Sequence, residues 1–370
     1  MNPYDRLLPF NNLPSLPPPD SIIDKEILLI WGKASRALAE LNKNLHRLPN
    51  PTMLVNTLIL QEAKSSSAIE NIFTTEDELY KAISDSLKEE SANLNTKEVL
   101  RYREALWTGF ADIKASGEIS QEAIIKVFRQ IKKTKQGIRP PQSLVIIKRG
   151  QSEFRAGEII YTPPRGKGIV ETKMENLLAY LNQKDQEETD PLLKMAIAHY
   201  QFEAIHPFTD GNGRTGRIIN LLYLVHQGLL SHPILYLSKY IIENKDEYYH
   251  CLSAVTQRQA WKEWIIFMMN AVQQTSVYTN GIIDEIIDQM AATLDHGKKE
   301  LKWYSKELNE AIFSQAYIKP NLIGKVLGRT SRTTLTKYMN DLCKTGILNP
   351  KQEGKEVYYL NTDLIRILEE

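Results

Sequence analysis

One short segment near the middle of the chain concentrates the residue types that handle phosphate chemistry. Glycines let a backbone approach a ligand closely, and the free N–H groups at a helix N-terminus attract anions. Two arginines spaced three apart share one face of a helix and can both reach a polyphosphate. The pattern predicts a phosphate-binding turn that opens a helix. The segment is His206, Pro207, Phe208, Thr209, Asp210, Gly211, Asn212, Gly213, Arg214, Thr215, Gly216 and Arg217.

Two side chains of this segment add the means for catalysis. His206 is of the type whose unperturbed pKa suits proton abstraction near neutral pH. Asp210 stands at the edge of the glycine turn, where a carboxylate can hold Mg²⁺ that is shared with phosphate oxygens. Two alternatives stay open from the residues alone. One is an ordinary loop with a structural His-Pro pair, and the other is a zinc site on His206 and Asp210, which lacks a third ligand nearby in sequence.

The segment from His206 to Arg217 matches, without a mismatch, the Fic signature His-x-Phe-x-Asp/Glu-Gly-Asn-Gly-Arg-x-x-Arg. The chain resembles the Fic family over roughly residues 20–275. The resemblance implies adenylyl transfer, in which AMP moves from ATP to a Ser, Thr or Tyr hydroxyl of a target protein or of the chain itself. It makes His206 the general base and Asp210 the Mg²⁺ ligand. The implied ATP-binding residues are Glu70, Asp210, Gly211, Asn212, Gly213, Arg214, Thr215, Gly216, Arg217, Tyr248 and Tyr249, with Arg214 and Arg217 on the β- and γ-phosphates.

A β-hairpin is expected before the signature, because residues 144–148 and 158–162 are β-prone runs separated by glycines. It resembles the Fic flap, which would align a target segment by adding it as a strand. The flap residues implied are Ile160, Tyr161 and Thr162. Further along, Tyr248 and Tyr249 resemble the tyrosines that line the adenine pocket, although two tyrosines on one helix also fit a core position.

A second motif lies well before the signature. Ser66, Glu70 and Asn71 match the family's inhibitory pattern Ser/Thr-x-x-x-Glu-Gly/Asn. By resemblance, Glu70 pairs with Arg217 and removes the arginine that should hold the γ-phosphate. This would make the chain a class II Fic protein that is inhibited in cis. The alternative is local: Ser67 and Glu70 have the spacing of a capping box at a helix N-terminus.

The elements around these motifs are expected to be mainly helical. Residues 1 to about 20 should form an extended arm, because prolines block regular structure there. A helix that follows Pro51 should stop or thin at Ser65–Ser67, since serines favour caps over helix interiors. Thr75 with Glu78 fits a capping box, and Asp190 before Pro191 fits an N-cap. Helices are expected at 22–45, 75–90, 95–114, 121–132, 190–205, 218–227, 262–272 and 276–295.

The last seventy or so residues follow another pattern. Helical periodicity at 305–316, 321–327 and 331–343 precedes two short strands around Gly354, an order that predicts a winged helix-turn-helix. Residues 298–370 hold 13 Lys and Arg against 9 Asp and Glu, a local net charge of +4. Cations and hydroxyls at the start of the third helix suit DNA contacts. The alternative is a domain for protein contacts or dimerisation. The residues concerned are Arg329, Thr330, Ser331, Arg332, Thr333, Thr334 and Lys337, with Lys351 and Lys355 on the wing.

The composition sets outer limits. The 370 residues are 42% hydrophobic and 25% charged, which excludes a disordered or collagen-like chain. No apolar run approaches the ~18 residues of a membrane helix, and the N-terminus does not resemble a signal peptide. With only two cysteines, a disulfide framework is excluded. We therefore expect a cytoplasmic protein with no membrane partner.

The expected fold is mainly α: a Fic-type helical core with a small β-hairpin flap, plus a C-terminal winged helix-turn-helix. The expected domains are an N-terminal helical region with the inhibitory motif (1–95), the Fic catalytic core (96–275), a helical connector (276–297) and the winged helix (298–370).

The expected function is a self-inhibited protein adenylyltransferase that uses ATP with Mg²⁺. Its partners would be a target protein and, as candidates, DNA and a second copy of the chain. Two alternatives keep the fold: a de-AMPylase, and an ATP-sensing transcriptional regulator that binds DNA. Intact His206 argues against a pure sensor, because binding phosphate needs no base.

Overall fold

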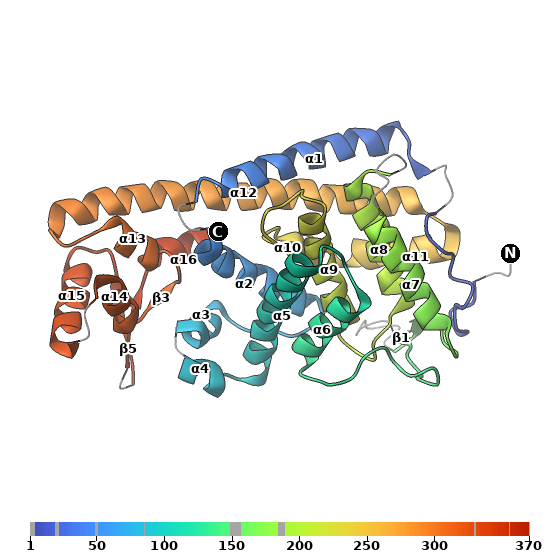
Figure 1. The fold of residues 1–370 in the computed structure, drawn as a ribbon, viewed down its shortest axis with the longest axis horizontal. Coiled ribbons are helices and arrows are strands. Elements are labelled where there is room, and N and C mark those ends of the chain that lie inside the picture. The colour runs from blue at the N-terminus through green and yellow to red at the C-terminus, as the bar shows by residue number, and fades with distance from the viewer. Residues whose placement is uncertain are drawn as a thin grey trace. The chain divides into compact units, whose positions relative to one another are not determined.

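The computed structural model describes residues 4–18, 22–48, 51–84, 86–148, 157–183, 189–328, 331–354 and 356–369. These residues form a mainly helical protein with two small antiparallel sheets, which confirms the expected fold class (Figure 1). The chain divides into two compact units. The first contains residues 1–38 and 101–275, and the second contains residues 39–100 and 276–370. No helix in the described part of the chain is long and apolar enough to cross a bilayer.

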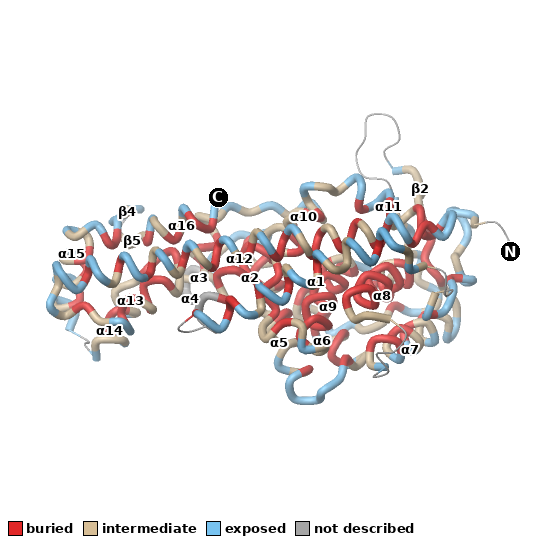
Figure 2. The backbone as a smooth tube through the Cα atoms, turned by 90° about the horizontal axis from the view of Figure 1, so that it is seen from above, coloured by how far each residue is buried: buried red, intermediate tan, exposed pale blue. Residues whose placement is uncertain are grey.

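The first unit is organised around helices α8 (Pro191–Ile205) and α9 (Asn212–His226). Nearly every residue of α8 after Pro191 is buried (Figure 2), and this includes the polar side chains of Lys194, His199 and Gln201. The helix begins as predicted, with Pro191 in its first turn and the Asp190 carboxylate accepting the Leu192 N–H at 2.8 Å. The other helices of the first unit are α1 (Lys25–Leu45, in part), α5 (Leu94–Ser116, in part), α6 (Gln121–Lys132), α7 (Ile169–Asn182), α10 (Leu237–Glu243), α11 (Lys245–Arg258) and α12 (Trp261–Glu300, in part).

The expected hairpin is present but short. Strand β1 (Ile147–Lys148) pairs antiparallel with β2 (Ile159–Tyr161), with Ile147 opposite Tyr161 and Lys148 opposite Ile159. An isolated two-stranded hairpin is marginally stable in water. Here residues 4–18 support the hairpin.

Residues 4–18 form an arm without helix or strand, as expected, but the arm packs on the first unit. The Phe10 N–H donates to the Thr162 carbonyl at 3.0 Å, and the Tyr4 hydroxyl donates to the Ile160 carbonyl at 3.1 Å. Both bonds attach the arm to carbonyls of β2 and of the residue that follows it. Further along, Leu13 and Leu16 are buried in the core.

The second unit contains the N-terminal helices after α1 together with the C-terminal elements. The C-terminal elements include a three-stranded antiparallel sheet of order β3-β5-β4. Short helices precede, separate and follow its strands along the chain. The three C-terminal helices and the two strands around Gly354 were expected, whereas β3 and α16 were not. The elements are α2 (Pro51–Ile69), α3 (Glu76–Ser84), α4 (Ser86–Ser91), α13 (Lys306–Ile312), β3 (Tyr317–Ile318), α14 (Pro320–Leu327), α15 (Arg332–Lys344), β4 (Asn349–Glu353), β5 (Glu356–Leu360) and α16 (Thr362–Glu369).

Polar contacts tie α3 to the sheet within this unit. The Asp77 carboxylate accepts hydrogen bonds from Lys81 at 2.5 Å, from Lys351 at 2.6 Å and from the Tyr317 hydroxyl. These bonds outweigh the opposing effect of partial burial and hold the pKa of Asp77 below its usual range. Lys351, which was expected to contact DNA from the wing, is instead engaged by Asp77. Lys355, Arg329 and Thr330 lie outside the described residues.

Helices α7, α10 and α11 were not predicted, and some helix boundaries also differ from expectation. Helix α2 continues through Ser65–Ser67 to Ile69, and Ser66 and Ser67 are fully buried in it. Packing of these small side chains outweighs their weak preference for caps. The helices expected at 262–272 and 276–295 form the single helix α12, within which the Thr275 hydroxyl donates to the Ala271 carbonyl at 2.6 Å.

A close approach at Gly109 of α5 gives a test of this packing. A methyl group added there would lie 2.4 Å from Leu222 Cδ1 and 2.9 Å from Val127 Cγ2. We expect Gly109→Ala to lower the free energy of unfolding by ~1–3 kcal/mol through overpacking. Gly32→Ala is the matched control, since its nearest neighbour is 3.8 Å away, and it should raise stability by up to ~1 kcal/mol through helix propensity. Urea unfolding followed by circular dichroism measures both. Equal effects would contradict the packing.

Candidate functional site

The turn between α8 and α9 places His206. Helix α8 ends at His206, which takes the left-handed conformation with φ 50° and donates its N–H to the Phe202 carbonyl at 3.0 Å. Its Nδ1 lies 3.3 Å from the Glu203 carbonyl. This contact favours the proton on Nδ1, so that Nε2 is the ring nitrogen that carries the lone pair.

The loop after His206 is closed by its own side chains. The Phe208 N–H donates to Asn212 Oδ1 at 2.8 Å, and Asn212 Nδ2 donates back to the Phe208 carbonyl at 2.9 Å. Phe208 is fully buried and stacks on Phe128 with a centroid separation of 4.0 Å. The Asn212 side chain therefore holds the loop closed.

Gly211 is the N-cap residue of α9, with φ 72°, and it makes no side-chain cap. The first N–H groups of any α-helix have no partner within the helix, so those of α9 form an anion site by their geometry. Arg214 and Arg217 leave the same helix, and both are almost fully buried. Thr215 donates its hydroxyl to the Gly211 carbonyl at 2.9 Å and so strengthens the first turn.

Asp210 stands at the mouth of this turn. One oxygen accepts the Gly211 N–H at 2.7 Å, and the other lies 2.6 Å from Lys132 Nζ at the end of α6. Partial burial raises the pKa of Asp210, but Lys132, the Gly211 N–H and the charge of Arg214 outweigh it and lower the pKa below its usual value. The carboxylate is thus ionised and already attracts a cation.

Asp210 fits a magnesium ligand of the kind that shares the ion with a substrate. Its side chain is 64% exposed. Across the described ranges, no cluster of three or more His, Cys, Asp or Glu residues forms a metal cage. Mg²⁺ commonly binds through one or two carboxylates with phosphate oxygens and water. The arrangement gives no support to the zinc alternative for His206 and Asp210.

Arg139 supports the turn through its side chain, and no motif of the sequence indicated this role. Its buried guanidinium donates to the His206 carbonyl at 2.8 Å, to the Ile205 carbonyl at 3.3 Å and to the Pro164 carbonyl. The backbone of Arg139 donates to the Pro207 carbonyl at 2.9 Å. One residue therefore satisfies the carbonyls released where α8 ends and joins them to the base of the hairpin.

Helices α8 and α9 approach closely at Gly216. A methyl group there would lie 2.5 Å from Glu203 Oε1 and 3.0 Å from Phe202 Cδ1. Gly216, expected in the ATP site, thus faces α8. This close contact fixes the direction in which the neighbouring Arg217 leaves the helix.

The two tyrosines expected at the adenine pocket lie in different environments. Tyr248 is 1% exposed and Tyr249 is 41% exposed. Their rings pack edge to face with centroids 5.2 Å apart. Only Tyr249 presents a surface on which a base could stack without moving its neighbours.

The flap residues are anchored by hydrogen bonds to α8 and to the arm. The Tyr161 ring is buried, and its hydroxyl donates to the Ala204 carbonyl of α8 at 2.7 Å. Thr162 donates its hydroxyl to the Arg6 carbonyl of the arm at 2.7 Å. Ile160 lies between Ile159 and Tyr161, the two residues that pair with β1. Its carbonyl accepts the hydrogen bond from the Tyr4 hydroxyl.

The inhibitory motif lies in the second unit, at the C-terminal end of α2. Asn71 has φ 63°, and the Asn71 and Ile72 N–H groups donate to the Ala68 and Ser67 carbonyls at 3.0 and 3.1 Å. This is a Schellman ending with Asn71 at the left-handed position, which Gly and Asn tolerate best. Glu70 follows the last residue of the helix. The capping-box interpretation of Ser67 and Glu70 is therefore wrong, because that motif requires a helix beginning.

The "Fic/DOC family N-terminal" and "Fic/DOC family" models match residues 30–111 and 93–224, together more than half of the chain. A third model, "Protein adenylyltransferase SoFic-like, C-terminal domain", matches residues 276–364. The chain belongs to the Fic/DOC family.

Individual relatives match over shorter ranges. Protein adenylyltransferase fic-1 of Caenorhabditis elegans is 35% identical over 92 residues, covering 25% of this chain and 17% of the relative. Protein adenylyltransferase Fic of Drosophila mojavensis is 29% identical over 126 residues, covering 33% of this chain and 24% of the relative. The chain thus matches less than a quarter of the length of these curated relatives.

Solved structures share the fold at low identity. A Fic family protein from Desulfovibrio desulfuricans has a TM-score of 0.57 and 19% identity, covering 93% of this chain and 98% of that one. Fic-1 from Caenorhabditis elegans, residues 134–508, has a TM-score of 0.52 and 21% identity, covering 69% of this chain and 73% of that one. These values support the fold.

Arg139 generates a test of how the turn is held. We expect Arg139→Met to lower the free energy of unfolding by roughly 1–3 kcal/mol for each buried carbonyl left without a donor. Arg129→Met is the matched control, because the exposed Arg129 also donates to a carbonyl, that of Gln136 at 2.9 Å. It should cost less than ~1 kcal/mol. Urea unfolding compares the two, and equal losses would contradict the support role.

Proposed function

We propose that this protein is an adenylyltransferase that transfers AMP from ATP to a hydroxyl of a protein, including its own. The observation that carries the proposal is the α8–α9 turn, which unites an oriented histidine, an ionised carboxylate, a glycine-opened helix N-terminus and two buried arginines. The curated relatives are named protein adenylyltransferases, which fits the same activity. Positioning and charge stabilisation are most of what such a transfer requires.

The residues divide the work by position. His206 Nε2 removes the proton of the acceptor hydroxyl, whose oxygen forms a bond to the α-phosphorus as the bond to the β-phosphate oxygen breaks. The N–H groups at the start of α9 hold the phosphates, and Arg214 and Arg217 neutralise the pyrophosphate that leaves. Asp210 would hold Mg²⁺, which would supply further neutralisation of the phosphate charge. The hairpin of Ile160, Tyr161 and Thr162 would align the acceptor segment.

The proposal includes inhibition in cis by Glu70, which would pair with Arg217. Two features of α2 support a dedicated role for this glutamate. It follows directly on a buried helix end that includes Ser66, and Asn71 fixes the chain direction just after it. A Schellman ending at this point gives Glu70 a defined position.

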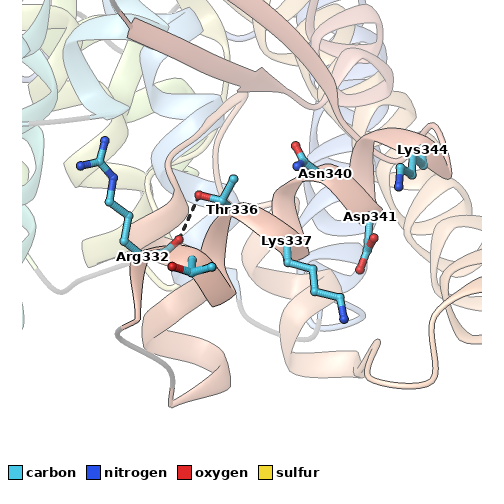
Figure 3. Close-up of a pocket in the computed structure, with 7 residues that line it drawn as sticks. Arg332, Thr336, Lys337, Asn340, Asp341 and Lys344 are labelled. Carbon is cyan, nitrogen blue, oxygen red and sulfur yellow. Dashed lines mark hydrogen bonds between the residues drawn. The ribbon is translucent and has the colours of Figure 1, made fainter.

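DNA binding through the C-terminal residues is a second candidate function, and α15 favours it. One face of this helix presents Arg332, Thr336, Lys337, Asn340 and Lys344 around a shallow hollow of about 550 Å³ (Figure 3). Asp341 is the acidic residue among them. Cations, hydroxyls and an amide on one helix face suit a nucleic-acid groove. A gel-shift with genomic fragments tests this candidate.

We expect His206→Ala to abolish transfer while the ATP dissociation constant changes less than a few-fold, because the base acts on the acceptor hydroxyl and not on the nucleotide. The measurement is incubation with α-labelled ATP and detection of label on protein, with ATP affinity from calorimetry. Full transfer in this variant would remove His206 from the mechanism. Release of label from modified protein by the unaltered chain would instead favour de-AMPylation.

We expect Glu70→Gly to raise self-modification at least about tenfold, because a freed arginine–phosphate contact is worth roughly 1.5–3 kcal/mol. The double variant Glu70→Gly with Arg217→Ala should lose the gain. Asn71→Gly is the matched control, since it keeps the left-handed ending and leaves Glu70 in place. A Glu70→Gly protein with unchanged labelling would exclude the proposed inhibition.

A further inference from the structure

Lys132, the last residue of α6, reaches the signature turn from a helix outside the signature. Its Nζ lies 2.6 Å from Asp210 Oδ2, and its side chain is 25% exposed against 64% for that of Asp210. The stem of the lysine lies on Gly211, where an added methyl group would be 3.1 Å from Lys132 Cδ and 3.3 Å from Lys132 Cγ. The ammonium is therefore held beside the residue that opens α9.

A second cation approaches the same glycine. The methyl position on Gly211 is also 3.9 Å from Arg214 Nη2. Arg214 leaves the first turn of α9, whose N–H groups attract anions. Cationic side chains from two separate helices thus meet at the start of α9. A lysine ammonium binds phosphate well, as a compact charge on a flexible stem.

The contact with Asp210 conflicts with metal binding. One oxygen of this carboxylate accepts the Gly211 N–H at 2.7 Å, and the other holds Lys132. Two cations that share one carboxylate oxygen repel each other strongly at short range. Mg²⁺ bound by Asp210 would therefore displace the ammonium. The stem of Lys132 can stay on Gly211 while its end turns towards the first turn of α9.

We propose that Lys132 is a further phosphate-binding residue, which holds Asp210 until Mg²⁺ binds and then contacts the phosphates of ATP. The inference rests on the proposed function, which places Mg²⁺ on Asp210 and the phosphates at the start of α9. The alternative is a structural role, in which Lys132 orients Asp210 for the metal. The two roles predict opposite changes of metal affinity when the charge of Lys132 is removed.

Lys132→Met tests the proposal, because it keeps a stem on Gly211 and removes the charge. In the full chain carrying Glu70→Gly, Mn²⁺ alone should bind about threefold tighter, as measured by electron paramagnetic resonance, since a competing ion pair is lost. ATP at saturating Mg²⁺ should bind about tenfold weaker by calorimetry, since a contact to a charged group is lost. Mn²⁺ binding that is weaker or unchanged overturns the proposal, and so does unchanged ATP binding.

Matched variants separate this role from a general loss of positive charge. Lys126→Met removes the same charge from another pair of α6, in which Lys126 lies 2.9 Å from Asp112, and it should change neither affinity. Equal shifts in this variant would contradict the proposal. Asp210→Asn should abolish the Mn²⁺ binding, and a metal that still binds would not lie at Asp210 and would overturn it. Lys132→Gln, with a neutral polar end, should repeat both shifts.

These readouts do not depend on transfer of AMP. If both shifts occur in a protein that places no label from α-labelled ATP on any protein, Lys132 keeps its role and only the proposed transfer is contradicted. If Lys132→Met changes neither affinity while the Glu70→Gly protein transfers AMP, the role of Lys132 is overturned and the proposed function stands.

Discussion

The buried guanidinium of Arg139 is the interaction on which the signature turn depends. Every helix leaves its last carbonyls without partners inside the helix, and a buried carbonyl without a donor is costly. Arg139 supplies those donors from one planar group and reaches the base of the hairpin with the same atoms. The positions of His206 and of the flap are therefore coupled. Close packing of α8 on Gly216 then sets the direction of α9 and its arginines.

The local patterns of the sequence predicted much of this arrangement, because they are carried by adjacent residues. The cap at Asp190, the capping box of Thr75 and Glu78, and the glycine-opened helix at Gly211 were all accessible in this way. Features that depend on distant partners were not. Nothing near Arg139 or Lys132 in sequence indicates the carbonyls or the carboxylate that each one contacts. The serines of α2 misled for the same reason, since their burial, and not their type, decides the helix.

The second unit combines the inhibitory motif with the C-terminal elements. Thr57 of α2 donates to the Ser314 carbonyl at 3.1 Å, and Asp77 of α3 is held by Tyr317 and Lys351. Exposed ion pairs of this kind contribute little each, but several around one carboxylate define a geometry. Because α2 and α15 belong to one compact unit, a partner bound on the face of α15 acts on the same unit that holds Glu70. The proposed inhibitory residue Glu70 and the candidate nucleic-acid face of α15 are thus parts of one compact unit.

The arm on the flap bears on how the chain folds. The contact between Tyr4 and Ile160 joins residues separated by 156 positions, and the bond from Gln201 to the Pro14 carbonyl spans 187. Contacts of such high sequence separation form late, because a long loop must close before they contribute. During synthesis the arm leaves the ribosome before the hairpin and α8 and must wait for them. The arm is therefore expected to dock on the hairpin only after the core around α8 and α9 has assembled.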